Sequence, residues 1–141
     1  MKFSMFIPVG HIQPGEFQSA AAIAAMARGL EAANVDACFL TDHPAPSAEW
    51  LHANGHDALD PFTALAFVAA ESSRLQLQTN ILVLPYRNPF ITAKAATTLQ
   101  VLSEGRFILG VGSGYQAAEF EALGVDFHKR GAMSEEYVRA M

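Results

Sequence analysis

The stretch LQLQTNILVLPYRNPFITAKAATTLQVLSEGRFILGVGSG, residues 75–114, contains the pattern that decides the fold. It begins with the apolar run Leu75–Leu84 and ends with a second one, Arg106–Gly112. Between these runs, Asn88-Pro89 places a capping side chain before a proline that needs no N–H donor, and Gly105 ends the following segment. The stretch therefore predicts a strand, a helix and a second strand in succession.

The same alternation extends upstream to the first residues of the chain. Apolar residues recur every three or four positions over 16–33, which is typical of an amphipathic helix. Strand starts near residues 3, 37, 77 and 106 repeat this β-α unit four times. The expected strands are apolar on both faces, as in a parallel sheet covered on both sides, so the sequence predicts an α/β fold. The expected upstream elements are a strand over Phe3–Val9 closed by Gly10, a helix over Glu16–Ala33 after Pro14-Gly15, a strand over Ala37–Leu40 and a helix from Asp60-Pro61 to Ser73.

Composition restricts the class of protein further. The 141 residues suit one domain, 1–141, and a content of 51% hydrophobic against 16% charged residues excludes a disordered chain. A net charge of −5 gives no basic surface for nucleic acid or an anionic membrane, and no apolar run is long enough to span a bilayer. The single cysteine, Cys38, cannot form an internal disulfide, so we expect a reducing, cytoplasmic setting.

The number of predicted β-α units is compatible with two folds that have parallel strands. A closed eight-unit barrel needs about 250 residues, roughly twice this length, and an open doubly wound sheet needs about five strands where four are visible. Near the C-terminus, Ser134 with Glu135 and Glu136 is expected to start a helix that the chain leaves incomplete at Met141, which suggests a fragment.

Three motifs and several residues of the tail carry a family resemblance: Thr41–Pro44, Thr79–Pro89 and Ser103–Tyr115, with Glu119-Phe120, Leu123–Val125, Arg130-Gly131 and Glu136 in the tail. They resemble the luciferase-like monooxygenases, and the resemblance extends over essentially the whole chain. It is closest to the branch that uses a deazaflavin instead of FMN. The resemblance implies an oxidoreductase or monooxygenase that uses reduced FMN or a deazaflavin (coenzyme F(420)) on a small-molecule substrate. It also implies that the chain forms the first four βα units of a TIM (βα)8 barrel.

Asp42 and His43 follow the second expected strand, at the end of the strands that carries the active site in βα-barrel enzymes. A histidine there can titrate near neutrality and hydrogen-bond a bound ring or a developing charge. The alternative is a histidine that only bonds neighbouring loop carbonyls. The resemblance implies that His43 contacts the flavin–substrate region and takes part in catalysis, with Asp42 beside it in the cofactor site.

The resemblance also implies a cis peptide between Asn80 and Ile81, whose bulge would support the cofactor ring; an ordinary trans strand is the alternative. Gly110, Gly112 and Gly114 stand at alternate positions in and just after the fourth strand, where the lack of side chains lets a flat ring approach the backbone. The run also matches G-x-G-x-x-A, but it is not on the first strand of its unit and no later strand carries the acid of a dinucleotide site. We therefore expect Gly112, Ser113 and Gly114 at the rim of a cofactor cleft.

Two features of the sequence argue against a sugar-phosphate dehydrogenase and against a metal site. In deazaflavin dehydrogenases that resemble this chain, the catalytic acid directly follows the equivalent glycine, and Tyr115 stands there instead, which argues against sugar-phosphate dehydrogenation of that type. His52, His56 and Asp57 would suit zinc only on a shared helical face, and Asn54-Gly55 favours a loop, so no metal is expected.

A half-barrel would expose two edge strands and an inner face that Phe6, Phe39, Ile81 and Ile108 are available to line. We therefore expect a homodimer or a higher homo-oligomer. The loops after strands 7 and 8, which grip phosphate in many barrels, would be missing, so tight cofactor binding by this chain alone is not expected. Two alternatives to the enzyme remain at this point: a catalytically incomplete half-barrel that self-associates, and a nucleotide-binding doubly wound domain.

Overall fold

The computed structural model describes residues 1–8, 17–53 and 55–141. Six residues named in the sequence analysis lie outside the described residues: Val9, Gly10, Pro14, Gly15, Glu16 and Asn54.

A parallel sheet of four strands forms the centre of the structure. Its order is β1 (Ser4–Phe6), β2 (Ala37–Leu40), β3 (Gln76–Thr79) and β5 (Phe107–Ile108), with every neighbouring pair parallel. This order confirms the predicted sequential arrangement of parallel strands. The edges of this sheet are β1 and β5.

The third and fourth predicted strands are each interrupted near their carboxyl ends. After the break, β4 (Leu82–Val83) pairs with β6 (Val111–Gly112) in a second, two-stranded parallel sheet. The Asn80–Ile81 peptide bond at the first break is cis, which confirms the expectation from the family resemblance. Across the two breaks, the Thr79 hydroxyl donates to the Gly110 carbonyl at 2.7 Å and accepts from the Gly110 N–H at 2.9 Å. Only glycine suits position 110, because a Cβ there would lie 2.2 Å from the Thr79 carbonyl oxygen.

Two of the helices begin at the caps that the sequence predicts: Asp60 accepts from the Thr63 N–H, and Asn88 accepts from the Phe90 N–H. The first helix begins at Ala20, later than the predicted start, and Ser19 caps it by accepting from the Ala22 N–H. A short helix, α2, lies between the strand over Ala37–Leu40 and Asp60, where the sequence predicted no helix. The helices are α1 (Ala20–Ala32), α2 (Ala48–His52), α3 (Pro61–Glu71), α4 (Pro89–Leu102), α5 (Ala117–Ala122) and α6 (Arg130–Ala140), with 3-10 turns η1 (Leu84–Tyr86) and η2 (Phe127–Lys129).

The prediction that Ser134 starts the last helix is wrong. Asp126 caps η2 by accepting from the His128 N–H, and this turn continues directly into α6 at Arg130. Ser134 therefore lies inside the helix, where its hydroxyl donates to the Arg130 carbonyl at 2.7 Å. Serine is favoured as a helix cap, but it can also make this bond inside a helix, so the local sequence alone did not exclude the second position.

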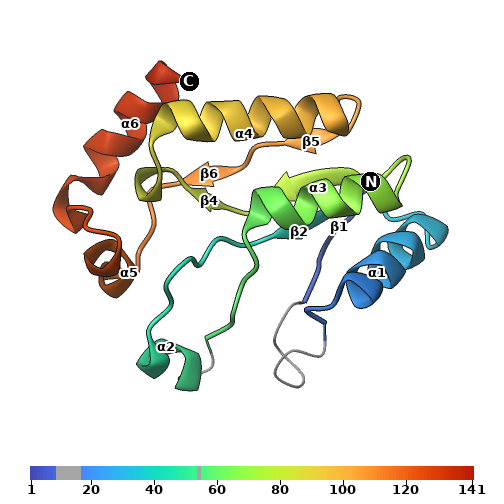
Figure 1. Cartoon of the computed structure of the whole chain (residues 1–141), viewed down its shortest axis with the longest axis horizontal. Coiled ribbons are helices and arrows are strands. Elements are labelled where there is room, and N and C mark those ends of the chain that lie inside the picture. Colours follow the sequence, from blue (N-terminus) through green and yellow to red (C-terminus); the bar gives the residue numbers. More distant parts are fainter. Residues whose placement is uncertain (9–16, 54) are drawn as a thin grey trace.

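The helices that follow the first three strands pack on one face of the sheet. Figure 1 shows α3 and α4 lying beside each other along the strands, with α1 next to α3. A single core joins them to the strands, and it contains Ile23 of α1, Leu65 and Val68 of α3, Leu99 of α4, and Cys38, Leu40 and Leu77 of the sheet. Helices on one face contradict the doubly wound alternative, which requires helices on both.

The opposite face of the sheet carries a row of side chains in register: Phe6, Phe39, Gln78 and Ile108. The Phe6 and Phe39 ring centroids are 5.5 Å apart, and Ile108 is 40% exposed. Three of the four residues expected to line an inner face are thus on it. The fourth, Ile81, lies between β3 and β4 and instead packs against the cluster of Val83, Tyr86 and Phe120. Within the described ranges, no helix has the length and apolarity that a membrane crossing requires.

Candidate active site

A pocket of about 300 Å³ lies where the carboxyl ends of the strands meet the following loops. It brings together five of the residues predicted from the sequence: Asp42, His43, Asn80, Ile81 and Gly114. The other two, Gly112 and Ser113, line a separate hollow next to α6. Thr41, His56, Val83 and Tyr115 complete the lining of the first pocket.

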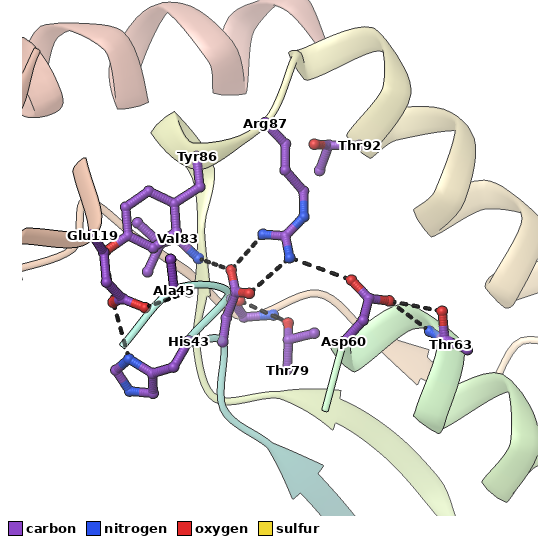
Figure 2. A network of polar contacts seen from close by, with 12 residues as sticks. His43, Ala45, Asp60, Thr63, Thr79, Val83, Tyr86, Arg87, Thr92 and Glu119 are labelled. Atoms are coloured by element: carbon purple, nitrogen blue, oxygen red, sulfur yellow. Dashed lines mark hydrogen bonds and ion pairs between the residues drawn. The ribbon is translucent and has the colours of Figure 1, made fainter. Parts of the chain in front are cut away.

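His43 is held by a carboxylate that is distant in the sequence. The ring is 9% exposed, and its Nδ1 atom lies 3.1 Å from Oε2 of Glu119, a residue with no exposed surface. The Tyr86 hydroxyl donates to the same Oε2 at 3.0 Å, and the Ala45 N–H donates to Oε1 at 3.2 Å. Figure 2 shows the His43 ring and the Tyr86 phenol both directed at Glu119. Glu119 was visible in the sequence only as part of a family motif, and its contact with His43 was not predicted.

The protonation of this cluster follows from its contacts. Burial alone would raise the pKa of Glu119, but the bonds from His43, the Ala45 N–H and Tyr86 outweigh it and hold that pKa below its ordinary value. Burial and the neighbouring Glu119 carboxylate raise the pKa of the Tyr86 phenol, which therefore keeps its proton and donates. An ionised carboxylate only accepts, so the proton of a neutral His43 ring is assigned to Nδ1.

Three further aromatic rings lie close to His43. The centroid of the Trp50 ring is 4.6 Å away, that of His56 is 4.8 Å away and that of Tyr115 is 6.3 Å away. Trp50 belongs to α2 and is the single tryptophan of the chain. Trp50 thus places α2, which lies between β2 and α3 in the chain, beside His43. The spacing and composition of this segment resembled an ordinary loop, so the sequence carried no signal for this contact.

Asp42 connects the neighbouring loops. Arg87 donates to its two carboxylate oxygens at 2.6 and 2.8 Å, and the Val83 N–H donates to Oδ2 at 3.0 Å. The same guanidinium reaches Asp60, the cap of α3, at 3.3 Å (Figure 2). Burial alone would lower the pKa of Arg87, but Asp42 and Asp60 outweigh it and raise that pKa. Asp42 therefore holds the segment before His43 against the turn after β4.

Gly114 and Thr41 also line the pocket that holds His43. Gly114 has a φ of +77°, and a Cβ there would lie 2.7 Å from Val83 Cγ1, so only glycine fits at this position of the lining. The Thr41 hydroxyl is buried and has no hydrogen-bond partner among the described residues. Because buried polar atoms are generally paired, a ligand with donors or acceptors along its edge would complete this site. A flavin or deazaflavin ring has such an edge, so the residues present fit the predicted cofactor.

The part of the chain that the structure describes holds no cluster of three or more His, Cys, Asp or Glu side chains that could bind a metal ion. His52 ends α2, and His56 lies in the segment beyond it, so the two histidines do not share a helical face.

Parallel βα units whose carboxyl ends surround a pocket with a buried histidine are the arrangement of a βα-barrel enzyme. The sequence matches the profile of the luciferase-like monooxygenases over residues 1–141, and the chain belongs to this family. Solved relatives in this family are TIM barrels, and the four βα units here correspond to part of one.

Individual relatives agree with this assignment. An F420-dependent glucose-6-phosphate dehydrogenase of Kineococcus radiotolerans is 40% identical over 113 residues, which cover 77% of this chain and 32% of the relative. The crystal structure of the monooxygenase RslO1 from Streptomyces bottropensis matches 99% of this chain and 41% of its own, with 26% identity and a TM-score of 0.81. The oxygenating constituent of 3,6-diketocamphane monooxygenase of Pseudomonas putida, solved in complex with FMN, shares the fold. It has 18% identity and a TM-score of 0.81, with 98% of this chain and 37% of the other covered. The chain thus spans about a third of the length of the curated relative.

Proposed function

We propose that this chain is the N-terminal part of an oxidoreductase that binds reduced FMN or a deazaflavin in the pocket beside His43 and oxidises a small organic substrate. The observation that carries the proposal is one pocket that joins His43, the cis Asn80–Ile81 peptide and Gly114 at the carboxyl ends of the strands. The names of the relatives, which include an F420-dependent enzyme and an FMN complex, support this choice of cofactors.

The residues that line the pocket would have different roles in binding the cofactor and in proton transfer. Ile81 and Gly114 would hold the flat face of the ring, and the Thr41 hydroxyl would bond its polar edge. A reduced flavin or deazaflavin supplies the reducing equivalents when it is bound. His43 would hold or move a proton at Nε2, the ring nitrogen that does not face Glu119. The Trp50 and Tyr115 rings would limit the access of water to His43.

The part of the pocket that this chain forms shows no site for a sugar phosphate among its described residues. The described lining of the pocket contains no lysine or arginine, the side chains that usually bind phosphate. The one carboxylate in it, Asp42, is already bonded to Arg87. Tyr115, in the place of the acid of similar sugar-phosphate dehydrogenases, also supports a monooxygenase over a dehydrogenase of that type.

Cofactor titration tests the proposal. FMN and coenzyme F(420) are titrated into this chain and into a version extended downstream in its gene, with Trp50 fluorescence as the readout, because that ring lies against His43. We expect quenching and saturable binding of one cofactor by the extended protein, and weak or absent binding by residues 1–141. The two cofactors compared in parallel also decide which one is used.

His43→Ala and His128→Ala in the extended protein are a matched pair, since His128 is an exposed histidine remote from the pocket. We expect turnover with the preferred cofactor to fall at least about 100-fold in His43→Ala, the usual contribution of a proton-transferring group, and to be unchanged in His128→Ala. Failure of the extended protein to bind either cofactor, or unchanged turnover in His43→Ala, would contradict the proposal.

A further inference from the structure

We propose that Glu119 is a positioning residue that fixes the proton of the neutral His43 ring on Nδ1 and so presents Nε2 to the pocket as a proton acceptor. This inference rests on the proposed function for the role of Nε2, but the tautomer itself is a property of this chain without any ligand.

The contacts of Glu119 leave it one hydrogen-bonding role. Its side chain is fully buried, and three groups lie within hydrogen-bond distance of its two oxygens. The Ala45 backbone N–H can only donate. The Tyr86 phenol carries its proton in the buried site and donates to Oε2. The carboxylate therefore acts as an acceptor toward every neighbour, and the His43 Nδ1 atom must be a donor.

The proton on Nδ1 also determines the protonation state of the other ring nitrogen of His43, Nε2. When Nδ1 carries the proton of a neutral imidazole, Nε2 has a lone pair and accepts. Because Nδ1 faces Glu119, Nε2 lies on the far side of the ring from the carboxylate. A proton taken up there makes the ring cationic, and the ionised Glu119 at 3.1 Å stabilises that charge. His43 can then return the proton to the same ligand atom or pass it to water, so no further reactant is needed.

Glu119 also determines where the His43 ring lies. Its partners come from two separate segments: His43 and Ala45 after β2, and Tyr86 in η1 after β4. The ring orientation therefore depends on a carboxylate 76 positions away in the sequence. Tyr86 and Phe120 pack behind it with ring centroids 4.8 Å apart, which restricts the movement of this part of α5.

Glu119→Gln separates a positioning role from simple packing, because it preserves shape and changes the donor pattern. If the glutamine oxygen faces the Ala45 N–H, its NH2 group faces Nδ1 and Tyr86. The His43 proton then moves to Nε2. If the glutamine is reversed, its NH2 group opposes the Ala45 N–H, and two donors meet in a buried site. The first arrangement avoids this conflict, so we expect the tautomer to change.

The experiment is 15N NMR of the histidine rings in the 141-residue chain at about pH 8.5, where an ordinary imidazole is neutral. The His43 signals are assigned by their loss in His43→Ala. We expect the Nδ1–H tautomer in the wild type and a majority of the Nε2–H tautomer in Glu119→Gln. Two controls should retain the wild-type tautomer: Glu121→Gln, an exposed glutamate on the same helix, and Tyr86→Phe, which leaves the His43–Glu119 contact in place.

The wild-type spectrum alone keeps the inference falsifiable if Glu119→Gln does not fold. A wild-type His43 in the Nε2–H form would overturn it, as would a folded Glu119→Gln that keeps the Nδ1–H form. Neither result depends on a cofactor. Failure of the cofactor titration therefore refutes the proposed function and leaves the tautomer assignment intact, whereas a wrong tautomer refutes only the role of Glu119.

Discussion

Replacing Arg87 by alanine removes the hydrogen bonds at 2.6 and 2.8 Å that join its guanidinium to the two oxygens of Asp42. The Asp42 side chain is 1% exposed, so its charge stays buried with the Val83 N–H as a remaining donor. Removing one partner of a buried ion pair costs about 3–5 kcal/mol. Because the Arg87 side chain is 21% exposed, water can enter the space that it leaves. We therefore expect the free energy of unfolding to fall by the lower figure, about 3 kcal/mol.

Urea unfolding followed by circular dichroism measures this loss, with the slope of the transition checked for two-state behaviour. Arg28→Ala is the matched control, because Arg28 pairs with Glu71 through side chains that are 60% and 31% exposed. Surface pairs of this kind contribute about 0–1 kcal/mol. Combining Arg87→Ala with Asp42→Asn should recover part of the loss, since a neutral amide is less costly to bury alone. The reasoning is refuted if Arg87→Ala costs no more than Arg28→Ala.

Three further predictions concern the core, pH and assembly. Phe120→Ala should cost about 3–5 kcal/mol in the same urea assay, because the ring is fully buried between Tyr86 and Phe127; a loss below about 1 kcal/mol would contradict this packing. The pKa of Glu119 is lower in the folded than in the unfolded chain, so its stabilising contribution is complete above the unfolded value of about 4.3 and is lost as the pH falls through the folded one. Urea midpoints should therefore decline more steeply on acidification in the wild type than in Glu119→Gln, and parallel declines would refute the assignment. The edges β1 and β5, with the 40% exposed Ile108 on the uncovered face, lead us to propose that the chain forms a homodimer or a higher oligomer; sedimentation at micromolar concentration should show association, and a stable monomer would contradict it.

Elements with local signals at their ends could be predicted from the sequence. Asp60-Pro61 and Asn88-Pro89 combine a side-chain acceptor with a proline at the first helical position, and α3 and α4 begin at those prolines. The four parallel strands were likewise expected from the sequence, with starts near residues 3, 37, 77 and 106. These features depend on residues that are close in sequence, so their physical cause lies within one segment.

The breaks in the third and fourth strands could not be derived from the residues alone. The expectation of a cis bond at Asn80–Ile81 came from a family resemblance. The matching break near Gly110 depends on its paired hydrogen bonds with Thr79, 31 positions earlier. An apolar run that bends looks the same in sequence as one that continues.

Only part of the candidate site could be predicted, because several of its contacts join residues that are far apart in the sequence. His43 was found because it directly follows a strand, and the structure places it in a pocket with Asn80 and Gly114. The carboxylate of Glu119 and the ring of Trp50 reach His43 only after distant loops have folded together. No spacing in the sequence carries that information.

A crystal structure of the downstream-extended protein with its preferred cofactor tests the central claim most directly. We predict that the cofactor ring lies against Ile81 and Gly114, with a polar edge bonded to the Thr41 hydroxyl and a reactive edge within reach of His43 Nε2. A ring bound elsewhere, for example in the apolar groove between α3 and α4 that Phe62 and Leu99 help to line, would contradict the account.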